Sequence, residues 1–149
     1  MINITIRRAD ETDFSSVYTL ICQLVGAEYG TILQTDMKDI YVKNLSSDMK
    51  DSFVAMSNGH VIGFMSLTYD MRLSEVGKVT VIDELVVDEK QRNSGIGSAL
   101  IHYAINCAIK NSCGYIEVST NLRRIDAHKF YEKASFEKNG YRFGYSCGD

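Results

Sequence analysis

The chain has 149 residues, of which 45% are hydrophobic and 23% charged, a balance typical of a soluble globular domain. A chain of this length can bury a sizeable core without metal or disulfide support, and its composition excludes disordered and collagen-like proteins. Its apolar runs are shorter than the roughly 18 residues needed to cross a bilayer, and its first residues lack a secretory signal pattern. We therefore expect one domain over residues 1–149, cytoplasmic and without membrane contact.

Charge is distributed unevenly along the chain. Residues 1–89 carry 14 acidic and 7 basic side chains, whereas residues 90–149 carry 5 acidic and 9 basic ones, which gives −7 and +4 and the overall −3. A negative chain has no general attraction to nucleic acid, so we expect no nucleic-acid partner. The asymmetry favours an anion bound by the second half and a cation attracted by the first, against the alternative of a chance distribution of solvated charges.

The cysteines do not form a metal-binding or redox pattern. Cys22, Cys107, Cys113 and Cys147 include no C-x-x-C pair, and no His stands at zinc-ligand spacing. We expect reduced thiols and no metal site.

The first half predicts a strand, two helices and a hairpin. Ile2, Ile4 and Ile6 alternate with polar residues, as in a strand with one buried face. Helices are predicted from residues 10–13 to about 26 and over residues 35–45, the second with Met37, Ile40, Tyr41 and Leu45 inward. Asn58-Gly59, between two β-prone runs, predicts a hairpin with a type I′ turn.

The second half predicts a parallel strand, helix, strand unit. After a loop at residues 70–77, a strand over 78–87 ends in an apolar run, and a helix follows from Ser94 to the Cys113-Gly114 pair. A short strand over 115–119 then lies parallel to the first. A helix over 123–134 and a final strand or hairpin over 136–147, turned at Asn139-Gly140, complete the predicted order.

The segment between the apolar strand and the long helix carries the clearest chemical signal. A glycine-rich turn that enters a helix exposes backbone N–H groups at the positive end of the helix dipole, which suits a phosphate or pyrophosphate. Gly95 and Gly97 permit close approach, and Arg92 adds a cation. Leu100 excludes the dinucleotide fingerprint, and the chain has no Walker loop.

Arg92-x-x-Gly95-x-Gly97, after Leu85-Val86-Val87, resembles the acyl-coenzyme A signature of the Gcn5-related N-acetyltransferase (GNAT) superfamily. With Ile82-Asp-Glu before it and Ser119-Thr-Asn121 and the residues 126–136 after it, the resemblance covers roughly residues 52–145. It implies an α/β, single-domain GNAT fold, a twisted mixed sheet of about 6–7 strands flanked by about 4 helices. One departure is Ser135, where the family usually has Gly; it costs about 1 kcal/mol if the position requires positive φ.

The resemblance also implies acetyl-CoA as co-substrate. The backbone of Leu85, Val86 and Val87 would pair with its pantetheine arm like an added strand, and Asn121 would hydrogen-bond the arm, against the alternative that Asn121 caps a helix. The pyrophosphate would lie on the amides of the loop and first helical turn, which are Arg92, Asn93, Ser94, Gly95, Ile96, Gly97 and Ser98.

Two side chains are candidates for the chemistry. An alkylamine of pKa near 10.4 is protonated at neutral pH, so the reaction needs a base, and Glu84 is the candidate, directly or through water. Strand alternation predicts that Asp83 points to the opposite face. By the resemblance, Tyr131 would donate a proton to the departing thiolate, and an amide of Val86 or Val87 would polarise the carbonyl. The alternatives are a structural ion pair for Glu84 and a core position for Tyr131.

These features predict an N-acetyltransferase that moves acetyl from acetyl-CoA to a primary amine by direct attack in a ternary complex. The acidic first half favours a small cationic acceptor, polyamine or aminoglycoside-like, or a peptide amine. The alternative is a non-catalytic acyl-CoA-binding sensor or regulatory module. Tyr141, Phe143 and Tyr145 alternate as in a strand that could form a homodimer or could equally face the chain's own core.

Overall fold

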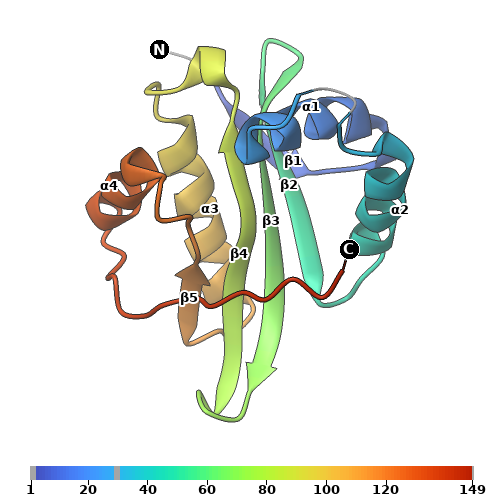
Figure 1. The fold of residues 1–149 in the computed structure, drawn as a ribbon. Helices are drawn as coiled ribbons and strands as arrows, with labels where there is room; N and C mark the ends of the chain where they lie inside the picture. Colours follow the sequence, from blue (N-terminus) through green and yellow to red (C-terminus); the bar gives the residue numbers. More distant parts are fainter. Residues whose placement is uncertain (1–2, 29–30, 149) are drawn as a thin grey trace. The chain divides into compact units, whose positions relative to one another are not determined.

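The structure, a computed structural model, describes residues 3–28 and 31–148. The chain divides into two compact units, Met1–Val118 and Ser119–Asp149, each treated below by itself. Among the described residues, the first unit holds one five-stranded sheet in the order β1-β2-β3-β4-β5 (Figure 1). The strands are β1 (Thr5–Arg8), β2 (Lys50–Ser57), β3 (His60–Arg72), β4 (Gly77–Val87) and β5 (Tyr115–Val118).

Neighbouring strands pair antiparallel from β1 to β4, and β5 is parallel to β4. The parallel pair confirms the predicted strand, helix, strand unit, and the mixed sheet with its helices confirms the predicted fold class. Five strands are described where about six or seven were expected. The missing elements belong to the carboxy-terminal segment, considered below.

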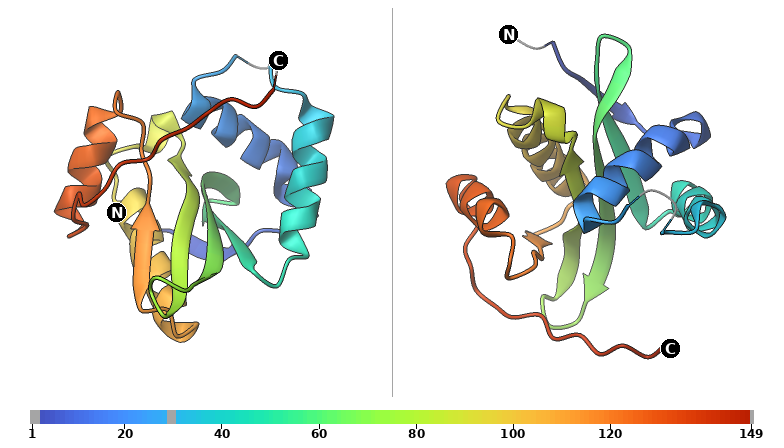
Figure 2. Two further views of the ribbon diagram at one scale, coloured as in Figure 1. Left: turned by 60° about the horizontal axis from the view of Figure 1, so that its bottom comes forward. Right: turned by 45° about the horizontal axis from the view of Figure 1, so that its top comes forward.

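Helices cover both faces of the sheet (Figures 1 and 2). On one face lie α1 (Phe14–Val25) and α2 (Gln34–Leu45), and on the other lies α3 (Ile96–Lys110). Side-chain contacts agree, because Phe53 of β2 packs edge-on against Tyr103 of α3 with ring centroids 4.8 Å apart. Short 3-10 turns precede α1 (η1, Glu11–Asp13) and follow β4 (η2, Glu89–Gln91).

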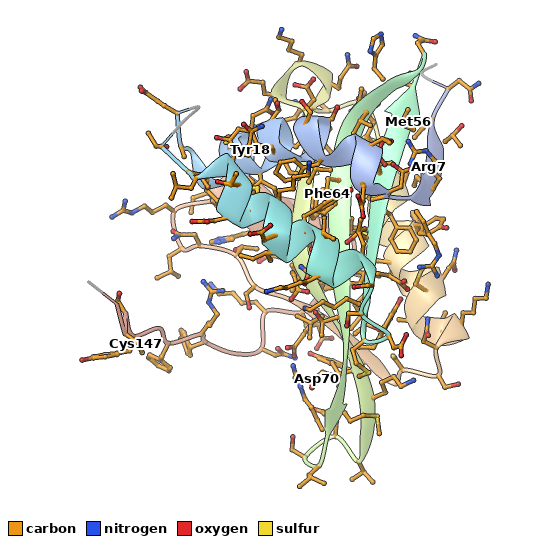
Figure 3. All side chains as sticks on the ribbon, turned by 90° about the vertical axis from the view of Figure 1, so that its right-hand side faces the viewer. Arg7, Tyr18, Met56, Phe64, Asp70 and Cys147 are labelled. Atoms are coloured by element: carbon orange, nitrogen blue, oxygen red, sulfur yellow. The ribbon has the colours of Figure 1, made fainter. Side chains whose placement is uncertain are left out.

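The core on the α1 and α2 face is aromatic. Phe64 of β3 lies between the sheet and the helices (Figure 3), where its ring contacts Tyr41, and Tyr41 contacts Phe14 of α1. Tyr18 donates its hydroxyl to the Ile32 carbonyl, which ties the segment before α2 to α1. The expected inward set of α2 needs one correction, because Ile40 is 59% exposed on the helix face turned away from this core.

Two turns show how far local sequence fixes backbone geometry. Asn58 and Gly59 have φ values of 49° and 77°, which confirms the predicted type I′ turn between β2 and β3. The expected loop at residues 70–77 is shorter than predicted, because β3 runs to Arg72 and β4 begins at Gly77. Ile2 of the predicted first strand lies outside the described residues, and β1 begins at Thr5.

The second unit contains α4 (Ile125–Lys133) and ends that helix with a Schellman motif. Ser135 has φ +70°, its N–H donates to the Glu132 carbonyl, and the Phe136 N–H donates to the Tyr131 carbonyl. Position 135 thus requires the left-handed backbone that the family's glycine adopts without strain.

The expected strand or hairpin over residues 136–147 is not formed in the described part of the chain. Asn139 and Gly140 lack the positive φ values that Asn58 and Gly59 adopt, so they do not make a hairpin turn. Tyr141, Phe143 and Tyr145 are 86–93% exposed. Their alternation is compatible with a strand, but a strand exists only where a neighbour supplies its hydrogen bonds, and here these residues join no sheet.

Candidate active site

A β-bulge in β4 places two consecutive carboxylates on one face of the sheet. Ser66 of β3 pairs with Glu84, but the next β3 residue, Leu67, pairs with Ile82, so Asp83 is the extra residue. The Thr68 hydroxyl hydrogen-bonds the Asp83 carboxylate and the Ser66 hydroxyl hydrogen-bonds the Glu84 carboxylate. The expectation that Asp83 points to the opposite face is therefore wrong, because the bulge interrupts the alternation on which it relied.

The Glu84 carboxylate lies in a partly desolvated setting. Its backbone N–H donates to the Ser66 hydroxyl at 3.1 Å, and that hydroxyl also meets its side chain. Burial raises the pKa of Glu84, the adjacent Asp83 charge raises it further, and Lys50 opposes both. A carboxylate with a raised pKa accepts a proton more readily than an exposed one, as a general base requires.

Lys50 faces the same pair of carboxylates. Its Nζ donates to Thr68 Oγ1 at 2.7 Å and lies 3.8 Å from Asp83 Oδ2. Lys50 and Asp83 are each about one third exposed, so the pair is accessible to solvent and weakly held. The alternative role for Glu84 was a structural ion pair. On this face, Lys50 lies within ion-pair distance of Asp83, the neighbour of Glu84 in the chain.

The strand edge beside Glu84 is available for hydrogen bonding in the first unit. β5 pairs with β4 over Val79–Ile82, and β4 continues for five residues beyond that pairing. On the β3 side, Asp88 N–H donates to the Ile62 carbonyl at 2.9 Å. In an antiparallel pair, the backbone N–H and C=O groups of successive residues point alternately toward the neighbouring strand and away from it. Val86 therefore points its backbone groups toward β3, whereas Leu85 and Val87 point theirs away from it. Of the two amides considered for polarising a carbonyl, the geometry favours Val87.

The glycine-rich segment that follows β4 forms a backbone nest at the start of α3. Asn93 and Gly95 have positive φ values of 62° and 85°, and no side chain caps the helix. The N–H groups of the first helical turn, which includes Ile96, Gly97 and Ser98, have no partner within the helix. Such a nest at a helix N-terminus suits an anion with several oxygens.

Arg92 connects this nest to the strand edge. Its Nε donates to the Val87 carbonyl at 3.3 Å, which agrees with Val87 pointing away from β3. The Ser94 hydroxyl hydrogen-bonds the Gln91 carbonyl and shapes the turn, so it does not cap α3. Arg92 and Asn93 are exposed. The edge of β4 from Leu85 and the loop up to Ser98 can thus bind one elongated ligand that carries an anionic group in its middle.

The other two predicted site residues, Asn121 and Tyr131, belong to the second unit. Asn121 Oδ1 accepts the Arg123 N–H at 2.9 Å in the turn before α4. This bond is not the helix cap weighed as the alternative for Asn121, because α4 begins at Ile125 and has no side-chain cap. Tyr131 is 9% exposed, with its ring 5.2 Å from Phe130 and 5.8 Å from Phe136. Burial raises the pKa of Tyr131 to about 12, and its phenol therefore stays protonated at neutral pH.

Sequence reasoning missed Asp83 as a member of the site, and the run Ile82-Asp-Glu carries no residue type that marks a bulge.

Residues 3–28 and 31–148 contain no cluster of His, Cys, Asp or Glu that could hold a metal ion. All four cysteines are free. In the same described residues, no helix is long and apolar enough to span a bilayer.

Comparison with known proteins places these features in context. A sequence model of the acetyltransferase (GNAT) family matches residues 16–136, parts of both units. The chain is 33% identical over 138 residues to the aminoalkylphosphonate N-acetyltransferase of Salmonella typhimurium, covering 93% of this chain and 88% of the relative.

Solved structures share the fold at lower identity. A transcriptional regulator from Bacillus halodurans C-125 superposes with a TM-score of 0.86 at 23% identity, over 96% of this chain and all of that one (100%). An aminoglycoside N-acetyltransferase, AAC(6')-Iy in complex with CoA, superposes with a TM-score of 0.84 at 19% identity, over 98% of this chain and 95% of that one. These structural likenesses concern the fold alone.

Proposed function

The chain belongs to the acetyltransferase (GNAT) family, and from that premise we propose that it transfers acetyl from acetyl-CoA to a primary amine of a small cationic acceptor. The amine attacks directly in a ternary complex, and Glu84 accepts its proton. The observation that carries this proposal is the bulge that sets Asp83 and Glu84 beside the open edge of β4.

The first unit fits acetyl-CoA on geometric grounds. The backbone groups of Leu85 and Val87 point away from β3 and can pair with the amides of a pantetheine arm, as an added strand would. The nest around Gly95 matches a pyrophosphate in charge and in hydrogen-bond polarity, with Arg92 at its edge. Acetyl-CoA supplies the activated thioester, and the residues described next supply proton transfer and charge stabilisation.

The amine needs a base because its ordinary form is an ammonium. Glu84 is suited to that role, since its desolvated carboxylate has a raised pKa and the Ser66 hydroxyl fixes its orientation. The amide of Val87 points toward the ligand side of the strand, where it can stabilise charge that develops on the carbonyl oxygen. Tyr131, protonated at neutral pH, is the proposed donor to the departing thiolate.

Charge on the α1 and α2 face of the sheet supports a cationic acceptor. Asp83 and Glu84 face one nearby lysine, Lys50. Near the far ends of β3 and β5, the Arg72 guanidinium is engaged by Asp70 and by both oxygens of Glu117. These four carboxylates outnumber the two basic side chains, Lys50 and Arg72, so this face attracts ammonium groups.

A thiol-release assay over an amine panel tests the proposal. The panel contains a diamine, a polyamine, an aminoglycoside, a peptide with a free amino terminus, and an amino sugar whose single amine is its only ionisable group. It also contains an aminoalkylphosphonate, because the Salmonella relative is an aminoalkylphosphonate N-acetyltransferase. We expect acetyl-CoA-dependent thiol release that is fastest with the multiply cationic amines. Release that is fastest with the phosphonate would overturn the cationic acceptor and leave the transferase. Acetyl-CoA binding with no release from any amine would favour the sensor alternative.

A further inference from the structure

A single side chain on α1 ties that helix to the segment between β4 and the anion-binding nest. Gln23, half-buried near the end of α1, accepts the Glu89 N–H at 3.0 Å through Oε1. Its Nε2 donates to Asp88 Oδ1 at 3.4 Å. One amide group therefore satisfies a backbone donor 66 residues away in sequence and a carboxylate 65 residues away.

The two groups that Gln23 holds fix the path of the following turn. Asp88 is the N-cap residue of η2, where its Oδ1 also accepts the Lys90 N–H at 3.3 Å and its carbonyl accepts the Gln91 N–H at 2.8 Å. The Gln91 carbonyl in turn accepts the Ser94 hydroxyl, directly before the left-handed Gly95. A continuous chain of hydrogen bonds thus connects Gln23 to the start of α3.

We propose that Gln23 is a positioning residue for the cofactor, which holds the turn between β4 and α3 in the geometry that binds the CoA pyrophosphate. The inference rests on the proposed function. Gln23 does not touch the pyrophosphate; it acts through Asp88 and Glu89. Small displacements of a preorganised anion site weaken binding because its N–H groups no longer converge on the same oxygens.

The test measures the dissociation constant of CoA by titration calorimetry, together with KM for acetyl-CoA and for the amine. Gln23→Ala is expected to raise the CoA dissociation constant and the KM for acetyl-CoA about 5- to 10-fold, equivalent to about 1–1.4 kcal/mol. KM for the amine should change less than about 2-fold. Thr19→Ala, one turn earlier on α1, where the Thr19 hydroxyl donates to the Ser15 carbonyl, is the matched control and should leave all three constants unchanged.

A polarity swap separates positioning from general damage to the fold. Gln23→Glu keeps an acceptor for the Glu89 N–H but sets a carboxylate against Asp88, so CoA binding should weaken at least as much as in Gln23→Ala. Adding Asp88→Asn restores a donor between the two side chains and leaves an oxygen for the Lys90 N–H. Affinity should then recover to within about 3-fold of wild type.

The outcomes distinguish this inference from the function on which it rests. No CoA binding by the wild-type chain overturns the proposed function and the inference with it. Wild-type binding combined with an unchanged dissociation constant in Gln23→Ala overturns the inference alone. Failure of the double variant to recover affinity also counts against it, because a lost hydrogen bond that acts through Asp88 must respond to the chemistry at position 88.

Discussion

Asp83 and Glu84 are adjacent in the chain, yet both carboxylates lie on the same face of the sheet, each hydrogen-bonded to a hydroxyl of β3. A regular strand would send them to opposite faces. The bulge at Asp83 therefore concentrates negative charge beside the strand edge proposed for the cofactor, and it makes the pKa of Glu84 depend on its neighbour.

Glu84→Gln should remove the base and spare the binding site. We expect kcat to fall about 10²- to 10³-fold, because positioned general bases contribute on the order of 10²–10⁴ in rate. KM for acetyl-CoA should change less than about 3-fold. Initial-rate thiol release checks this, with Asp83→Asn as the neighbouring control. If kcat fell as much in Asp83→Asn as in Glu84→Gln, the assignment of Glu84 as the base would be wrong.

The pH dependence of kcat/KM should report the charges around Glu84. A base works when deprotonated, so activity falls as pH drops through its pKa. Asp83→Asn removes a negative neighbour, which lowers the pKa of Glu84 and moves the acid limb to lower pH. Lys50→Met removes a positive neighbour and moves the limb to higher pH. Profiles recorded with one amine give both shifts, and shifts of the same sign in the two variants would contradict the assignment.

Tyr131→Phe should cost activity with little loss of stability. The rings of Phe130 and Phe136 pack against an aromatic ring that Phe retains, whereas the proton donor is lost. We expect kcat to fall about 10²-fold, within the usual range for a general acid. The pKa of about 12 predicts no alkaline limb from this residue below about pH 11 in the wild-type enzyme. A variant with full activity and an unchanged melting temperature would leave Tyr131 as a core residue.

Ser135→Gly should stabilise the chain. The φ of +70° that the Schellman motif demands is strained for serine, and glycine removes about 0.5–1 kcal/mol of that cost. In a domain of this size that corresponds to a rise of about 1–4 °C in melting temperature. Ser135→Ala keeps the strain and should give no gain. If alanine stabilised as much as glycine, the effect would not come from the backbone at this position.

Much of the fold can be predicted from the sequence, because interactions between residues close together in the chain determine these parts of the backbone. Asn58-Gly59 specifies its turn through two positive φ values, and the apolar stripe of α1 specifies its buried face. Serine in place of glycine at position 135 lowers stability only if φ is positive there, and φ of Ser135 is +70°.

Other features depend on partners that a single segment does not contain. The aromatic alternation at Tyr141, Phe143 and Tyr145 predicts a strand only if another edge accepts it. The Asp83 bulge arises from how β4 registers against β3, so periodicity within β4 could not reveal it. Ile40 likewise matches a helical stripe, but the face that α2 presents to the sheet is set by Tyr41 and its contacts with Phe14 and Phe64.

The central claim, that the β4 edge and the start of α3 hold acetyl-CoA, is tested most directly by thermal unfolding with and without the ligand. At 100 times its dissociation constant, a ligand that binds the native state adds about 2.7 kcal/mol to the free energy of unfolding. We predict a rise of several degrees in melting temperature with acetyl-CoA and with CoA, since both carry the pyrophosphate and the pantetheine arm. An unchanged melting temperature at millimolar acetyl-CoA would contradict the account.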